Sequence, residues 1–208
     1  MNDIWQYLRS ADRPIVMYGT GNGADKIFDV LDSLGIEVKD IFASDGFIRN
    51  RTFHGKKVIS YSDILKKYGN DMIILLAFGS DLPEVINRFF ALASKHELYA
   101  PDVPVVGNKL FDGKFYEMHK SNIDAARKLL ADDESRAVYD AVIHYRLSGK
   151  IEYLAEHITD LDAVMTGLLH PASYLYTLDI GAYTGDTASA LISYAPNIKK
   201  IIALEPDS

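Results

Sequence analysis

The sequence predicts an α/β protein whose N-terminal segment, residues 1–118, forms a mostly parallel, doubly wound sheet. Two observations lead to this prediction. Short apolar runs alternate with segments whose apolar residues recur at helical spacing, which is typical of strands connected by helices. The connections are short, and short strand–helix–strand connections form right-handed crossovers within one sheet. A second strand–helix–strand unit is predicted in residues 174–208.

The expected strands of the N-terminal segment are apolar runs bounded by glycine, proline or polar residues. Residues 14–19 (PIVMYG) form a continuous apolar run, as in a strand that is buried on both faces. Residues 71–79 (DMIILLAFG) are the most strand-like run in the chain. Shorter runs at 37–44 and 56–60 supply two further strands, and an extended, proline-punctuated stretch follows at 96–107.

The helices between these strands are predicted from apolar spacing and from capping residues. Apolar residues at helical spacing follow the first strand, and Gly35 is expected to end this helix. Ser60 and Asp63 have the spacing of a capping box for a helix in 61–69. A third helix, in 82–94, has an apolar face that consists of Val85, Ile86, Phe89, Phe90 and Ala93.

The chain is predicted to consist of three segments. Residues 1–118 form the sheet domain, residues 119–173 form a helical bridge, and residues 174–208 begin a second α/β domain. Within the bridge, Ser121 is expected to cap one helix, and a second helix ends at the sequence LSGK. No internal repeat or low-complexity tract interrupts this organisation.

Composition and charge exclude several classes of function. The chain of 208 residues is 48% hydrophobic and 25% charged, as is usual for soluble proteins. Its net charge of −7 and the lack of a basic cluster argue against nucleic acid as a partner. The most apolar stretch, residues 72–78, is too short to span a membrane, and the N-terminus lacks a secretory signal. We therefore expect a cytoplasmic protein without a membrane or nucleic-acid partner.

The sequence also offers no metal site. It contains no cysteine, so disulfides and thiolate ligands are excluded. The six histidines show no ligand spacing, and a lone histidine is more often a packing or surface residue. No G-x-S-x-G sequence predicts a nucleophile elbow.

The strongest functional motif is LDIGAYTGD, which contains Asp179, Gly181 and Gly185. Its spacing lacks the middle glycine of the dinucleotide pattern G-x-G-x-x-G. S-adenosylmethionine carries no phosphate, and it requires only a loop that lets its methionine and ribose approach the backbone, which glycines allow. Glu205 ends the next strand, where an acceptor for ribose hydroxyls is expected. Alternatively, Asp179 and Asp186 are turn and capping residues, and Glu205 is a solvated strand end.

These residues resemble the opening cofactor motif of the FkbM-type methyltransferases, a branch of the class I S-adenosylmethionine-dependent enzymes. The resemblance rests on TLDIGAYTGDTASAL with IIALEPD, and upstream on IVMYGTGNGADKIFDVL, FASDGF, LLAFGS and LYAPDVPVVG, which resemble the Rossmann-like N-terminal domain of many bacterial members. It implies that Asp179, Gly181, Ala182 and Gly185 lie along the methionine and ribose, and that Glu205 holds the ribose hydroxyls. It also implies methyl transfer to a small-molecule acceptor, a hydroxyl of a sugar or natural product.

Most strands of such a methyltransferase domain would follow Ser208. We therefore expect weak or absent S-adenosylmethionine binding by this chain, because the walls that hold the adenine and the acceptor would be missing. The two C-terminal strands are apolar like central parallel strands, which need cover on both faces. We expect this tail either to pack on the helical bridge or to pair with a second copy, giving a homodimer.

A second glycine loop, YGTGNGAD, follows the first strand. Gly19, Gly21 and Gly23 precede Ala24, which occupies the third place of a G-x-G-x-x-A pattern, and Asp45 lies where a ribose-binding acid is expected. The loop predicts either a nucleotide site or only close packing of a helix on the sheet. The rival function is thus a non-catalytic module that binds a nucleotide-type ligand or assembles with partners. A dehydrogenase is less favoured, because no catalytic Tyr–Lys or His–acid pair can be placed.

Overall fold

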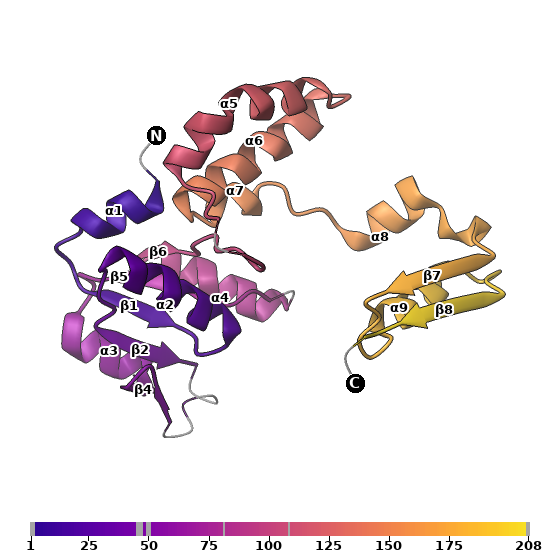
Figure 1. The fold of residues 1–208 in the computed structure, drawn as a ribbon. Helices are drawn as coiled ribbons and strands as arrows, with labels where there is room; N and C mark the ends of the chain where they lie inside the picture. The colour runs from indigo at the N-terminus through magenta and orange to yellow at the C-terminus, as the bar shows by residue number, and fades with distance from the viewer. Residues whose placement is uncertain (1–2, 45–47, 49–50, 81, 108, 207–208) are drawn as a thin grey trace. The chain divides into compact units, whose positions relative to one another are not determined.

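A computed structural model describes most of the chain, which divides into two compact units, Met1–His157 and Ile158–Ser208 (Figure 1). The residues described are 3–44, 48, 51–80, 82–107 and 109–206. The division between the units falls within the segment predicted as a helical bridge. Each unit has its own sheet.

The first unit contains a sheet of six strands in the order β3-β4-β2-β1-β5-β6 (Figure 1). The strands are β1 (Ile15–Tyr18), β2 (Asp40–Ala43), β3 (Thr52–Phe53), β4 (Lys56–Ser60), β5 (Ile73–Leu76) and β6 (Glu97–Tyr99). All neighbours are parallel except β3 and β4. After β1, the chain forms β2, β3 and β4 on one side of β1 within the sheet. It then returns to form β5 and β6 on the other side of β1. The predicted doubly wound α/β fold is therefore confirmed.

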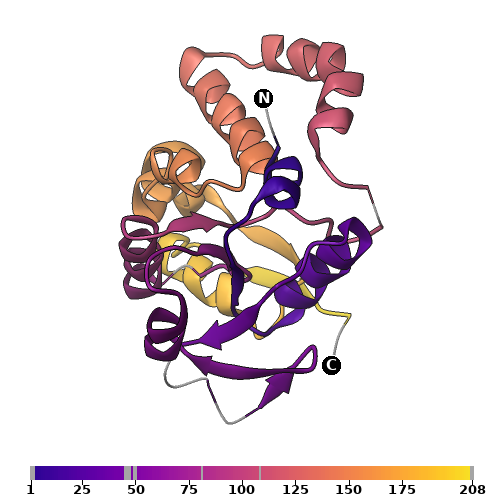
Figure 2. The same cartoon turned by 90° about the vertical axis from the view of Figure 1, so that its left-hand side faces the viewer.

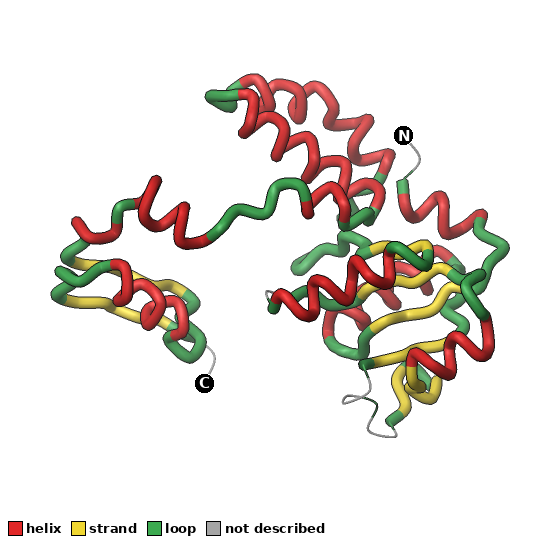
Figure 3. The backbone as a smooth tube through the Cα atoms, turned by 180° about the vertical axis from the view of Figure 1, so that it is seen from behind, coloured by secondary structure: helices red, strands yellow, loops and turns green. Residues whose placement is uncertain are grey.

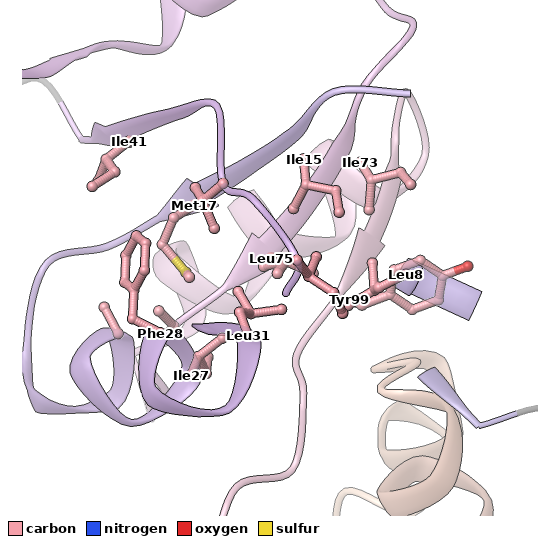
Figure 4. Close-up of a cluster of buried hydrophobic side chains, with 14 of the residues drawn as sticks. Leu8, Ile15, Met17, Ile27, Phe28, Leu31, Ile41, Ile73, Leu75 and Tyr99 are labelled. Carbon is pink, nitrogen blue, oxygen red and sulfur yellow. The ribbon is translucent and has the colours of Figure 1, made fainter. Parts of the chain in front are cut away.

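Helices cover both faces of this sheet (Figure 1). The helices are α1 (Ile4–Ser10), α2 (Asn22–Leu34), α3 (Tyr61–Tyr68) and α4 (Pro83–Ala93). Ile15 and Met17 of β1 pack in a cluster with α1 and α2, part of which is drawn in Figure 4. Val16 and Tyr18, the alternate residues, pack in a second cluster with α3 and α4. Burial on both faces explains the continuous apolar run.

Two long helices, α5 (Gly113–Lys128) and α6 (Asp133–Ser148), form a hairpin, and the short α7 (Glu152–Ala155) follows. Figure 2 shows the hairpin extending beyond the sheet. The prediction that Ser121 caps a helix is wrong, because Ser121 lies inside α5. The cap is Asp112, whose carboxylate accepts a hydrogen bond from the Phe115 amide at 2.8 Å. No residue of α5 is buried.

Polar contacts hold this hairpin together and attach it to the sheet. Arg127 of α5 donates two hydrogen bonds from Nε and Nη2 to the Asp140 carboxylate of α6, each 2.7 Å long. Gly149 ends α6 in the left-handed conformation, with φ of 69°. Its carbonyl accepts a hydrogen bond from the Ala100 amide, just after β6, at 2.7 Å.

Asp3 connects α1 to α5 through one buried carboxylate. Its Oδ1 accepts a hydrogen bond from the Gln6 amide and its Oδ2 one from the Gly113 amide, each at 2.7 Å. Asp3 therefore satisfies a donor at the N-terminus of each helix. We expect Asp3→Ala to lower the free energy of unfolding, measured with urea, by about 2 kcal/mol. Asp12→Ala, at an exposed position, is the control, and an equal effect of both variants would contradict this role for Asp3.

The second unit is a parallel two-stranded sheet with helical segments around it. Its elements are α8 (Leu161–Val164), a π-helical turn (Met165–Leu169), a 3₁₀ turn (Pro171–Ser173), β7 (Tyr176–Ile180), α9 (Asp186–Tyr194) and β8 (Lys200–Leu204). In Figure 3 the two strands lie side by side, with α9 along one face. The predicted strand–helix–strand order is confirmed. The alternative interpretation of Asp186 as a capping residue of α9 is wrong, because Gly185 occupies the cap position and no side chain bonds there.

The helical segment before β7 contacts α9 within this unit. The Asn197 side chain donates to the Ala172 carbonyl at 3.0 Å, and the Tyr194 hydroxyl is bonded to the Asp162 carboxylate. The C-terminal strand–helix–strand unit thus packs on the last part of the predicted bridge. Ala195, which directly follows α9, is fully buried, whereas Ile192 of α9 is exposed.

The face of β7 and β8 that lies away from these contacts is open. Its apolar side chains, all more than two-fifths exposed, are Tyr176, Leu178, Ile180, Ile202 and Leu204. Residues two apart on a strand share a face, and the parallel register places Leu178 opposite Ile202 and Ile180 opposite Leu204. A contiguous apolar surface of this kind is typical of strands at the centre of a sheet, which are covered on both faces. The homodimer that we expect from these strands stays a prediction.

Candidate functional site

The loop between β7 and α9 brings backbone amides to the carboxyl ends of both strands. The Gly181 and Ala182 amides donate to the Leu204 carbonyl at 2.8 and 3.0 Å, which fixes the start of the loop against the end of β8. Gly181 and Gly185 have φ of 83° and 82°, which an L-residue adopts only with strain. A Cβ atom at either glycine would meet no described atom within 4 Å, so the space beside the loop is open.

Glu205 directly follows β8 and faces this loop. Its Oε2 accepts a hydrogen bond from the Tyr183 amide at 2.6 Å. Tyr183 itself adopts the left-handed conformation, with φ of 43°. The acid at the end of one strand and the glycine loop at the end of the other are therefore in direct contact.

Asp179 lies near the end of β7, opposite Ala203 of β8. Its Oδ2 atom is buried and has no hydrogen-bond partner among the described residues. A carboxylate oxygen withdrawn from water without a donor is costly, so this oxygen is suited to receive a donor from a ligand. The five C-terminal residues singled out from the sequence, Asp179, Gly181, Ala182, Gly185 and Glu205, all lie at the carboxyl ends of β7 and β8. Their cofactor roles stay predictions.

The glycine loop of the first unit lies between β1 and α2. Gly19 has φ of 118°, and a Cβ atom there would lie 2.8 Å from the Phe78 ring. Gly23 is in the first turn of α2, and its Cβ would lie 2.3 Å from the Ala77 carbonyl oxygen. Gly21 differs, because a Cβ there would meet no described atom within 4 Å. Close packing therefore explains Gly19 and Gly23 but not Gly21. Asp45, the predicted ribose-binding acid, lies outside the described residues.

A cavity of about 280 Å³ adjoins this loop, and sequence reasoning missed the charged residues that line it. These are Arg51, which precedes β3, and Arg88 of α4. They are distant in the sequence and belong to no motif, so no local signal identifies them. Among the described residues, no group of three or more His, Cys, Asp or Glu side chains could hold a metal ion. None of the described helices is long and apolar enough to cross a membrane.

Comparisons with known proteins agree with the geometry of both units. A solved structure, the crystal structure of methyltransferase FkbM from Methylobacillus flagellatus KT, matches the chain with a TM-score of 0.60 and 18% sequence identity. The match covers 98% of this chain and 58% of that one. The chain has an FkbM-type methyltransferase fold. It spans less than two thirds of the length of that methyltransferase.

Sequence comparisons add nothing to this structural match. No protein-family model matches the chain. No curated protein matches it either. The arrangement of the helices and strands is therefore what shows the FkbM-type fold. A sequence identity of 18% shows a shared fold alone.

Proposed function

We propose that this chain supplies the first cofactor-binding unit of an S-adenosylmethionine-dependent methyltransferase that acts on hydroxyl groups of sugars or related natural products in the cytoplasm. The observation that carries the proposal is the contact between Glu205 and the loop, 2.6 Å from Oε2 to the Tyr183 amide. This contact places an acid and a glycine loop at the carboxyl ends of two parallel strands. Ligands of open α/β sheets bind at such ends. The FkbM-type fold supports the same activity.

The residues present fit this cofactor in three respects. The Oδ2 of Asp179, which has no partner among the described residues, would accept a hydrogen bond from the amino group of the methionine moiety. The open space beside Gly181 and Gly185 would allow the methionine and the ribose to pass close to the backbone. Glu205 would accept hydrogen bonds from the ribose hydroxyls while the loop amide holds its carboxylate in place.

S-adenosylmethionine supplies an electrophilic methyl group on a sulfonium sulfur. Transfer of that group is an in-line displacement, in which the acceptor oxygen bonds to the methyl carbon as the carbon–sulfur bond breaks. Catalysis of such a step depends mainly on holding the two reactants in line. In this chain the loop and Glu205 would orient the cofactor. No residue here is assigned to the acceptor or to removal of its proton.

Titration of the ¹⁵N-labelled chain with S-adenosylmethionine, followed by NMR, tests the site. We expect binding in the millimolar range, with amide shifts concentrated in residues 181–185. Glu205→Gln and Asp179→Asn should each weaken this binding, because each removes a carboxylate that would hold the ligand. Glu152→Gln, an exposed position on α7, is the matched control and should bind like the unaltered chain.

Two outcomes would contradict separate parts of the proposal. A micromolar dissociation constant measured by calorimetry would show that the expected weakness of binding is wrong, while the site itself would stand. Shifts spread over the chain, or shifts that Glu205→Gln leaves unchanged, would show that the loop is not the cofactor site.

A further inference from the structure

The cavity of the first unit lies where a doubly wound sheet holds its ligands. Its lining comes from the ends of β1, β2 and β5 and from α4. The chain leaves β1 toward β2 on one side and reaches β5 on the other, so the cavity is at the topological switch point. Crevices at the carboxyl ends of strands at such a point are the usual ligand sites of open α/β sheets.

The charged residues in the described lining of this cavity are both basic. Arg51 and Arg88 line it, and none of the described residues that line it is acidic. Within the described part of the chain, neither guanidinium group is paired with a carboxylate. Arg88 donates instead to the Ser44 hydroxyl at 2.9 Å, and the Ser44 hydroxyl is also bonded to the Tyr18 hydroxyl at 2.6 Å. The Arg88 guanidinium is thus oriented by neutral hydroxyl groups, and its remaining N–H groups can donate to an anion. Arginine favours phosphate groups because its donors are planar and can bind two oxygens at once.

The start of α2 adds to this positive character. Gly21 is the cap residue of this helix and also lines the cavity, and no side chain bonds to the cap position. A Cβ atom added at Gly21 would meet no described atom within 4 Å, so the space beside its backbone is open to a ligand. Amide groups and the dipole at a helix N-terminus favour an anion, which here would lie in the same cavity as the two arginines.

The Phe78 ring indicates the chemical character of the rest of the ligand, and the volume of the cavity indicates its size. Phe78 lines the cavity and is 38% exposed, although it packs edge-on against Tyr18 and Phe89. An exposed ring of this kind can stack with a flat or apolar moiety. The volume, about 280 Å³, is close to the lower end of the range for ligand pockets, about 300–1,000 Å³. This volume suits a single nucleotide rather than a dinucleotide.

We propose that this cavity binds a phosphorylated small molecule of the size of a nucleoside monophosphate, with its phosphate between Arg51, Arg88 and the start of α2. The proposal is independent of the C-terminal site, because S-adenosylmethionine carries no phosphate. It assigns a ligand to the N-terminal unit, which the methyl-transfer proposal leaves without a role.

Calorimetry on the 208-residue chain with AMP, adenosine, glucose 6-phosphate and inorganic phosphate tests this assignment. We expect AMP to bind and adenosine not to bind. Arg51→Gln and Arg88→Gln should each weaken AMP binding about tenfold, as expected for loss of one hydrogen-bonded charge. Gly21→Val should abolish binding by filling the approach to the backbone. Phe78→Ala should weaken binding of AMP but leave binding of inorganic phosphate unchanged.

The matched control is Arg9→Gln, which removes the same charge at an exposed position of α1 and should leave AMP binding unchanged. Circular dichroism of each variant shows whether it is folded. Tighter binding of glucose 6-phosphate than of AMP, with the same loss in both arginine variants, would support the phosphate site and identify a sugar as the second moiety. Adenosine binding as tight as AMP, failure of every phosphate ester to bind, or binding unaffected by both arginine variants would overturn the proposal.

Discussion

Replacement of Gly23 by alanine is expected to lower the free energy of unfolding of the first unit by about 3 kcal/mol. The added Cβ atom would lie 2.3 Å from the carbonyl oxygen of Ala77, far inside a normal contact. That oxygen belongs to the backbone directly after β5, so it cannot rotate away as a flexible side chain could. Relief of the clash requires α2 to move from the sheet, which disturbs the buried residues between them. Urea denaturation of the 208-residue chain measures the effect.

The same loop provides a matched control in Gly21→Ala. A Cβ atom at Gly21 meets no described atom within 4 Å, and its φ of −103° is accessible to any residue. This variant should unfold within about 0.5 kcal/mol of the unaltered chain. Similar stabilities of the two variants would contradict the view that close approach of α2 to β5 is what requires glycine at position 23.

This pair of variants separates the two explanations that the sequence left open for the glycine loop. A G-x-G-x-x-A pattern predicts either a nucleotide site or close packing of a helix on a sheet, and the sequence alone cannot divide the glycines between these roles. In the structure, Gly23 makes the close approach and Ala24 is fully buried in the core. Gly21 instead lines the cavity. The glycine that packs against β5 is therefore distinct from the glycine that borders the cavity.

Elements that are determined locally could be predicted from the sequence. Every residue of β1 and β5 is buried, so each strand is a continuous apolar run. Gly35 ends α2 in the left-handed conformation, with φ of 69°, as its position after the last apolar residue indicates. Ser60 caps α3 and accepts a hydrogen bond from the Asp63 amide at 3.1 Å, as the capping-box spacing predicts. These features depend on neighbours within one turn or one strand.

Features that depend on distant residues could not be predicted in this way. The contact of Asp3 with the start of α5 joins residues far apart in the sequence, because its Oδ2 accepts a hydrogen bond from the Gly113 amide. The cavity arginines come from separate elements, and Ser44, which orients Arg88, lies on another strand end. The contact of Glu205 with Tyr183 requires the chain to return through α9. In each case the fold supplies the proximity.

Arg13→Met should produce the second large effect, a loss of about 2 kcal/mol in the free energy of unfolding at neutral pH. Arg13 is bonded to the Glu97 carboxylate and donates to the Tyr7 hydroxyl at 2.7 Å. The Tyr99 hydroxyl donates to the other carboxylate oxygen at 2.5 Å. The side chains of Arg13 and Glu97 are 31% and 29% exposed, so the expected loss is smaller than for a fully buried pair. Lys66→Met, which breaks an exposed ion pair with Asp63, should change stability by less than about 0.5 kcal/mol.

The pH dependence of this loss distinguishes a charge effect from a packing effect. Burial raises the pKa of Glu97, but hydrogen bonds from Tyr7, Tyr99 and Arg13 outweigh burial, so its pKa lies below the ordinary value. A carboxylate with a lowered folded pKa contributes stability above its unfolded pKa, about 4.3, and this contribution is lost as the pH falls through the folded pKa. In Arg13→Met the pKa of Glu97 should rise, because burial then opposes ionisation with less compensation. The difference in unfolding free energy between the two chains should therefore shrink below about pH 4. A difference that stays constant from neutral to acidic pH would show that Arg13 stabilises the edge of the sheet by packing alone.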